Sequence, residues 1–225
     1  MAQQRKRATR YVTPAGIAVY PYLTEPDTKF DPEGAFKVTL RLAPSGEIST
    51  TKGETKGSIE QFLADMAEAS YNKAVADEAK SAAAAAKKPK KIKQADLPYS
   101  LDDDTGEVLI NFKLRASGKT RAGEVFTQKP ALFTDTGSPF TGDAIWGGSE
   151  LMVNFEVIPF YTALIGAGIS LRLKAAQVLT LVSSSGGGTA DTYGFAAEGS
   201  DEESDEESDE KAFTDASAFD DQGDF

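Results

Sequence analysis

The chain has 225 residues, a formal net charge of −11 at pH 7, and neither cysteine nor histidine. Its length suffices for one domain with a sizeable core plus appendages. Without cysteine and histidine, disulfides, thiolate metal sites, Ser-His and Cys-His nucleophile pairs and nearly all zinc chemistry are excluded, so we expect neither an enzyme nor a cofactor. No apolar run reaches the ~18 residues of a membrane span and no signal peptide is apparent, which predicts a cytoplasmic protein without membrane contact.

The chain opens with a basic arm, residues 1–15, which carries Arg5, Lys6, Arg7 and Arg10. Apolar and polar residues then alternate with period two, which predicts half-buried β-strands. These stretches are residues 16–23, 35–42, 107–116, 150–161 and 168–176, the last continuing to 182. A weaker strand is expected at 124–133, between two turn signals. Such strands predict a mainly β domain over residues 16–182, built as a small barrel or sandwich.

One helical segment interrupts the strands, within an insertion of about residues 56–93. From Ser58 to Ala86 the apolar residues follow three- and four-residue spacing, and Ser58 with Gln61 forms an N-terminal capping pattern. We expect the front half to pack on the barrel and the Ala/Lys-rich part, residues 82–93, to project. Its lysines are either a solvated hinge or a wing that contacts phosphates.

Alternate side chains of a strand share a face, so each stretch divides into a core row and an outward row. The core row is Ile17, Val19, Leu23, Phe36, Val38, Leu40, Leu42, Val108, Ile110, Phe112, Leu114, Leu151, Val153, Phe155, Val157, Tyr161, Ile169, Leu171 and Leu173. The outward row mixes rings with charged and polar groups: Tyr20, Tyr22, Lys37, Thr39, Arg41, Asn111, Lys113, Arg115, Asn154, Glu156, Phe160, Arg172 and Lys174.

That outward row suits a surface on which unpaired bases stack on rings while cations follow the phosphates. No basic helix for a duplex groove is apparent, which favours single-stranded nucleic acid. The candidate binding residues are Tyr20, Tyr22, Lys37, Arg41, Lys113, Arg115, Trp146, Asn154, Phe160, Arg172 and Lys174. Each ring has an alternative structural role, because tyrosine favours strands and a lone tryptophan can plug the end of a barrel.

The end of the chain is strongly acidic. Residues 191–225 carry 14 acidic residues and one lysine, whereas residues 1–190 carry 21 acidic and 23 basic residues. A Ser/Gly linker, residues 183–190, separates the two parts, and the tail has too few apolar residues to fold, so we expect it to be disordered.

A tail of this kind can simply aid solubility, but its phenylalanines have no core to serve. We therefore expect it to bind pockets of partner proteins through Phe219, Asp220, Asp221, Asp224 and Phe225. Its charge also predicts that it competes with DNA phosphates for the basic face.

Four segments together resemble the T7-type phage single-stranded DNA-binding proteins: "YPYLTEPDTKFDPEGAFKVTLRL", "WGGSELMVNFEVIPFY", "GAGISLRLKAAQVLTLV" and "DDQGDF". The resemblance implies a five-stranded OB-fold barrel with an inserted helix and a phenylalanine-ended acidic tail. It implies single-stranded DNA binding and strand annealing in phage replication and recombination, in the cytoplasm of the infected bacterial host cell.

The resemblance also implies that the tail contacts DNA polymerase and helicase-primase, of phage or host, and mediates a homodimer. Phe160 takes the place of an aromatic that the family uses for DNA, and Phe225 that of its terminal aromatic. Family members carry more lysine along "ELMVNFEV", where this chain has Met152, Asn154 and Glu156.

Two other function classes stay open. An acidic-tailed chaperone or scaffold would bind basic proteins with its tail and use its barrel only to oligomerise. An enzyme would need a carboxylate pair that holds Mg²⁺, and "LDDDTGEV" at residues 101–108 is the only dense candidate. Its Asp and Gly residues favour a turn instead.

Overall fold

The structure, a computed structural model, describes residues 8–120, 122–142 and 144–182, all within one unit, Met1–Gly187. The linker, the acidic tail and residues 1–7 of the basic arm lie outside the described residues. So do the tail residues that the sequence proposes for partner binding: Phe219, Asp220, Asp221, Asp224 and Phe225.

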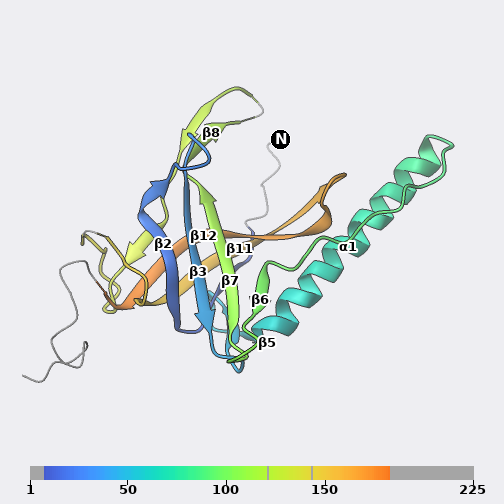
Figure 1. Ribbon diagram of the computed structural model, residues 1–225. Helices are drawn as coiled ribbons and strands as arrows, with labels where there is room; N and C mark the ends of the chain where they lie inside the picture. Colours follow the sequence, from blue (N-terminus) through green and yellow to red (C-terminus); the bar gives the residue numbers. More distant parts are fainter. Residues whose placement is uncertain (1–7, 121, 143, 183–225) are drawn as a thin grey trace, which may run out of the picture. The chain divides into compact units, whose positions relative to one another are not determined.

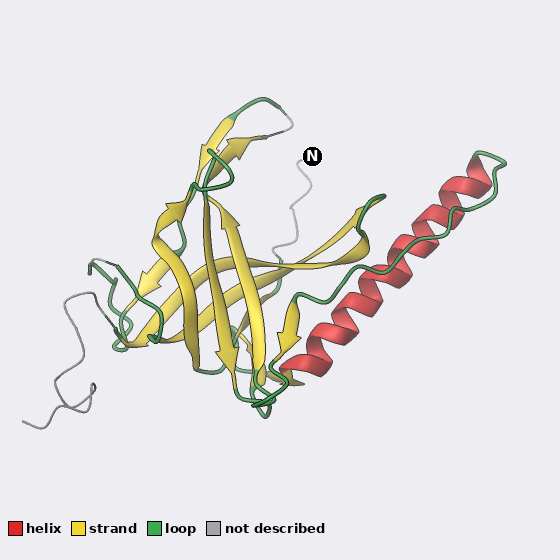
Figure 2. Cartoon of the chain, viewed as in Figure 1, coloured by secondary structure: helices red, strands yellow, loops and turns green. Residues whose placement is uncertain are grey.

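Five long strands close into a ring (Figures 1 and 2). They are β2 (Gly16–Asp27), β3 (Ala35–Leu42), β7 (Val108–Arg115), β12 (Gly166–Thr180) and β11 (Glu150–Thr162), in ring order. β11 pairs with both β12 and β2, which completes the ring. β7 and β12 run parallel, and the other neighbours are antiparallel. The mainly β class and the five-stranded OB-fold barrel are therefore confirmed.

Shorter strands extend this sheet. β1 (Arg10–Val12) joins β11 to β4 (Glu47–Thr50), and β4 pairs with β5 (Thr55–Ser58). β6 (Tyr99–Leu101) pairs with β7, and β10 (Ala131–Phe133) pairs with β12. β8 (Ser117–Lys119) and β9 (Val125–Thr127) form a separate hairpin.

Two expectations change with these short strands. The weak strand expected at 124–133 is two strands, β9 and β10, in different sheets, with the buried Pro130 between them. Proline lacks the N–H that a continuous ladder would need. Part of the segment expected as a basic arm, residues 1–15, belongs to the sheet: Arg10–Val12 pairs with β11, and the Thr13 N–H donates to the carbonyl of Val153 at 3.0 Å.

The core fills the ring. The predicted core residues of β3, β7 and β12 are buried, and the Phe112 and Phe155 rings lie 5.1 Å apart. The prediction was wrong in β2, where Ala18 and Leu23 are buried and Ile17 and Val19 turn outward. It was also wrong for Tyr161, which is exposed near the end of β11.

A β-bulge explains the error in β2. Val19 is opposite Thr39 and Tyr22 is opposite Lys37, so two residues of β2, Tyr20 and Pro21, face one residue of β3. The extra residue reverses the alternation of faces, so a strict period of two assigns the wrong side before the bulge.

The helix α1 (Ile59–Ala84) begins at the predicted cap, where the Gln61 N–H donates to Ser58 Oγ at 3.4 Å. Its front half packs on the barrel through Ile59, Phe62 and Leu63, and its far half projects from the ring (Figure 1). The returning chain bonds back to the helix, since the Lys90 N–H donates to Glu78 Oε1 at 3.1 Å. Within the described residues, no helix has both the length and the apolar character that a bilayer span requires.

Candidate nucleic-acid interface

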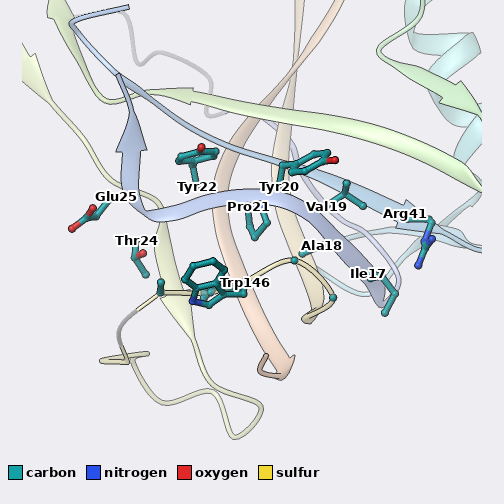
Figure 3. A pocket seen from close by; sticks show the side chains of 14 residues that line it. Ile17, Ala18, Val19, Tyr20, Pro21, Tyr22, Thr24, Glu25, Arg41 and Trp146 are labelled. Carbon is teal, nitrogen blue, oxygen red and sulfur yellow. The ribbon is translucent and has the colours of Figure 1, made fainter. Parts of the chain in front are cut away.

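Aromatic side chains border a groove on the outside of the barrel, which we call the aromatic groove. It has a volume of about 1020 Å³ and is lined by Tyr20, Tyr22, Trp146 and Arg41, among others (Figure 3). The side chains are 80%, 43% and 49% exposed for Tyr20, Tyr22 and Trp146 respectively. Trp146 therefore borders the groove and does not plug the barrel.

The backbone conformation that turns the Tyr20 ring outward is strained. Tyr20 has φ of +48° and stands before Pro21, at the bulge of β2. A left-handed conformation costs a side-chain-bearing residue about 1–2 kcal/mol, and glycine is usual at such a bulge. Strain of this kind gathers at functional sites, and an exposed ring gives no packing in return.

The loop that carries Trp146 is fixed along one edge of β2. The Gly148 N–H donates to the carbonyl of Ala18 at 2.9 Å, and the Ala18 N–H donates to the carbonyl of Ser149 at 2.8 Å. β3 pairs along the other edge of β2. Figure 3 shows the indole of Trp146 on one side of β2 and the rings of Tyr20 and Tyr22 on the other. The aromatic groove therefore crosses this strand.

A row of side chains leads from the groove across four neighbouring strands. Tyr22 is opposite Lys37, Lys37 is opposite Lys113, and Lys113 is opposite Arg172. Directly opposite residues point to the same side of a sheet, and the Lys37 amino group lies 5.1 Å above the Tyr22 ring. We call Lys37, Lys113 and Arg172 the cation ladder.

Most cations of this face are held in ion pairs. Arg41 pairs with Glu107 at 3.6 Å, Arg115 with Glu33 at 3.5 Å, and Lys37 with Asp27. The hydrogen bond from Lys37 is the main reason that the pKa of Asp27 lies below its usual value. Solvent-exposed pairs are weak and exchangeable, so a phosphate can replace these carboxylates. Among the described residues, Lys113 and Lys174 have no ion-pair partner.

Glu156 interrupts the basic surface beyond the ladder. It was expected in the outward row, but it is only 7% exposed and lies between two arginines. Its carboxylate is 3.3 Å from Arg10 Nε and 3.8 Å from Arg172 Nη1. Past it, Asn154 and Lys174 line a separate hollow of about 540 Å³, together with Arg10.

Phe160 stands apart from the other candidates. It lies opposite Gly168 towards the end of the β11–β12 hairpin, half-buried, and is not among the residues that line the aromatic groove. The structure therefore brings together Tyr20, Tyr22, Trp146 and Arg41, joins them through Lys37 to Lys113, Arg115 and Arg172, and leaves Asn154, Lys174 and Phe160 outside this group.

Sequence reasoning missed two rings. Phe30, in the loop between β2 and β3, is 86% exposed, and the Lys29 amino group lies 5.4 Å above it. Phe126, in β9, lines a hollow of about 420 Å³ with Lys113 and Arg115. The sequence feature that could have identified them is an aromatic residue beside turn residues, outside any strongly alternating stretch.

The acidic segment at 101–108 contains a turn, as predicted. The N–H groups of Asp104 and Thr105 donate to Asp102 Oδ1 at 3.1 and 3.0 Å, and these hydrogen bonds lower the pKa of Asp102. In the described part of the chain, no group of three or more acidic side chains is placed to hold a metal ion.

Comparisons with known proteins agree with this geometry. Residues 15–181 match the family described as "Single-stranded DNA-binding protein, Bacteriophage T7". Among solved structures, gp2.5 of bacteriophage T7, a single-stranded DNA-binding protein, has 23% identity and a TM-score of 0.61 over 84% of this chain and 94% of that chain. It shows the same fold.

A second solved structure is less similar. The single-stranded DNA-binding protein of bacteriophage Enc34 has 12% identity and a TM-score of 0.45, over 84% of this chain and 96% of that chain. No curated protein sequence matches the chain significantly.

Proposed function

The chain belongs to the family of T7-type phage single-stranded DNA-binding proteins, and we propose that it binds single-stranded DNA of any sequence, without catalysis. One observation carries the proposal. Three exposed rings around the aromatic groove adjoin the cation ladder, which crosses three neighbouring strands.

This surface has different places for the bases and for the phosphates of a bound strand. Unpaired bases stack on Tyr20, Tyr22 and Trp146, and each stacked base contributes about 1–3 kcal/mol. The backbone follows the cation ladder, with Arg41 and Arg115 beside it. Duplex DNA binds poorly, because its bases already stack on one another and hide their faces.

This arrangement reads no base sequence. Every base has a flat face, and cations contact phosphates that are common to all nucleotides. Phosphates must also displace the carboxylates of Asp27, Glu33 and Glu107 from their cations. We therefore expect binding to weaken steeply with salt, with a log-log slope of about −0.7 for each phosphate neutralised.

The test is a titration of the full chain with oligo(dT) and with a duplex of equal length, at two salt concentrations. Tyr22→Ala and Trp146→Ala should each weaken oligo(dT) binding about fivefold or more. The matched control is Tyr71→Ala, which removes a half-buried ring of α1 outside the interface. Equal affinity for duplex, or binding that ignores salt, would refute the proposal.

The remaining site residues extend the proposal. Asn154, Lys174 and Phe160 lie past the core of the interface and contact a longer strand that continues over β11 and β12. For Asn154 and Lys174 the support is their shared hollow with Arg10, which adds positive charge next to Glu156.

The acidic tail supplies the link to other proteins. It recruits phage or host DNA polymerase and helicase-primase through Phe219, Asp220, Asp221, Asp224 and Phe225, supports a homodimer, and competes with DNA for the cations. The protein then acts in replication, recombination and strand annealing, in the cytoplasm of the infected bacterial cell. The division of charge between residues 1–190 and 191–225 supports this role.

The chaperone or scaffold alternative gives the opposite outcome in the same titration. It requires affinity for basic proteins and none for oligonucleotides. The exposed rings of the aromatic groove would then have no role, which is why single-stranded DNA binding is the better account.

A further inference from the structure

The β8–β9 hairpin carries a ring beside the cations of the barrel. Phe126 lies in β9 opposite Gly118 of β8 and is half-buried. Its neighbours Val125 and Thr127 point to the other side of the hairpin and are exposed. The hairpin therefore has one face turned to the barrel and one to solvent.

Close packing holds the ring against Arg115. A Cβ atom added to Gly118 would lie 3.1 Å from Phe126 Cζ and 3.2 Å from Arg115 Cδ. Gly118 has no positive φ. The close approach of these two side chains, and not a turn, therefore accounts for a glycine at this position. The ring and the arginine stem both lie close to Gly118.

Three cations line a hollow beside this ring. Phe126 lines a hollow of about 420 Å³ with Lys113, Arg115 and Arg172, and the same three cations line an adjoining hollow of about 250 Å³. We call these two hollows together the hairpin hollow. A flat apolar ring beside several positive charges matches one nucleotide, whose base can stack while its phosphate meets the cations.

The base of the hairpin is fixed to the barrel. The Gln128 N–H donates to the carbonyl of Ala116, and its side-chain amide donates to the carbonyl of Arg115, both at 2.8 Å. Ser117 Oγ donates to the carbonyl of Glu33 at 2.7 Å. These bonds position Phe126 before any ligand arrives.

We propose that the hairpin hollow is a second stacking site, in which Phe126 binds a further base of the strand that occupies the aromatic groove. Lys113, Arg115 and Arg172 hold the adjacent phosphate. This inference rests on the proposed function. The row from Tyr22 through the cation ladder to Arg172 spans three strand spacings of roughly 4.8 Å each, so one continuous strand of several nucleotides can occupy both sites.

The chain has a single tryptophan, Trp146, which makes a site-specific fluorescence test possible. Two variants of the full chain carry Trp146→Phe and one new tryptophan each. Phe126→Trp places this tryptophan in the hairpin hollow, and Val125→Trp places it on the opposite face of the hairpin. Saturating oligo(dT) should quench the tryptophan at 126 and leave the one at 125 nearly unchanged. In the unaltered chain, quenching of Trp146 reports the aromatic groove.

Affinity provides the second readout. Phe126→Ala should weaken binding of a long oligo(dT) about fivefold or more, and Val125→Ala should leave it unchanged. If Trp146 is quenched but a tryptophan at 126 is not, and Phe126→Ala binds as the unaltered chain does, the hairpin hollow is refuted and the proposed function stands. If neither the variants nor the unaltered chain bind oligo(dT), the proposed function itself fails.

Discussion

Tyr20 is held outside the barrel by a backbone conformation that glycine adopts more easily. Its φ of +48° falls at the bulge of β2, and its side chain is 80% exposed. Selection for stability alone would favour glycine or a polar residue here. This strained and exposed position supports the proposal that the ring contacts bound DNA.

Replacing this residue separates binding from stability. Tyr20→Gly should relieve the strain and keep or raise the melting temperature, while it weakens oligo(dT) binding about fivefold or more. Tyr20→Phe, the control, retains the ring and should bind nearly as the unaltered chain does. Thermal melting and a DNA titration measure the two effects. A large loss of stability in Tyr20→Gly would show that the ring supports the fold.

Glu156 limits the charge that the barrel offers to DNA. Its buried carboxylate lies between Arg10 and Arg172, at 3.3 and 3.8 Å. A phosphate that approaches Arg172 competes with this carboxylate. The two ion pairs of Glu156 also have a structural role, because they join β1, β11 and β12.

We expect Glu156→Gln to tighten oligo(dT) binding several-fold and to steepen its salt dependence, because both arginines become available to phosphates. The same change should lower the melting temperature modestly, since the buried carboxylate loses its contacts with the half-exposed Arg10 and Arg172. Glu54→Gln is the matched control, because Glu54 pairs with Lys56 at 3.2 Å near β5, away from the interface. Weaker DNA binding by Glu156→Gln would contradict this account.

At the scale of elements, long strands were predictable and short ones were not. β3 and β7 alternate along almost all of their eight residues, and β12 alternates from Ile169 to Leu173, so their buried faces followed from the sequence. β1, β6, β8, β9 and β10 have three residues each, too few for a period to be distinguished from chance. Phe126 was missed for this reason.

Register decides which candidate residues meet. The sequence indicates that Tyr22, Lys37 and Lys113 face outward, but not that they stand opposite one another in adjacent strands. Pairing between distant segments depends on the bulge in β2 and on closure of the ring, which no local pattern encodes. For the same reason, no local pattern indicated that Asn154 and Phe160 lie away from the aromatic groove.

The helix α1 is attached to the barrel by a buried side-chain hydrogen bond in addition to its apolar face. Ser70 is 8% exposed, and its hydroxyl donates to the carbonyl of Gly168 in β12 at 2.7 Å. The apolar spacing predicted that this half of the helix packs on the barrel, but it gave no sign of the serine's role. Ser70 therefore fixes how α1 meets β12.

Ser70→Ala should destabilise the fold by about 1 kcal/mol, because the Gly168 carbonyl loses its partner inside the protein. That loss lowers the melting temperature by about 2–4 °C in a chain of this size. Ser81→Ala changes an exposed serine of the same helix and should have little effect. Affinity for oligo(dT) should stay within about twofold in both variants, because α1 lies outside the interface. An unchanged melting temperature for Ser70→Ala would rule out the anchoring role.

At the scale of the whole molecule, charge is divided along the chain. Residues 191–225 carry 14 acidic residues and one basic residue, whereas residues 1–190 carry 23 basic and 21 acidic residues. The overall charge of −11 would by itself argue against a polyanionic ligand. The proposed binding therefore relies on local cations, chiefly the cation ladder, and we expect the tail to oppose it.

Removal of residues 191–225 should therefore tighten oligo(dT) binding, most of all at low salt. The difference should shrink as salt is raised, because screening weakens the tail's competition and DNA binding alike. Phe225→Ala in the full chain keeps every side-chain charge of the tail, so its DNA affinity should match that of the unaltered chain while recruitment of polymerase is lost. Titrations of the three proteins at several salt concentrations, together with a polymerase pull-down, measure both effects. Equal DNA affinity with and without the tail at low salt would show that the tail's charge does not reach the binding surface, and its role would then be limited to partners.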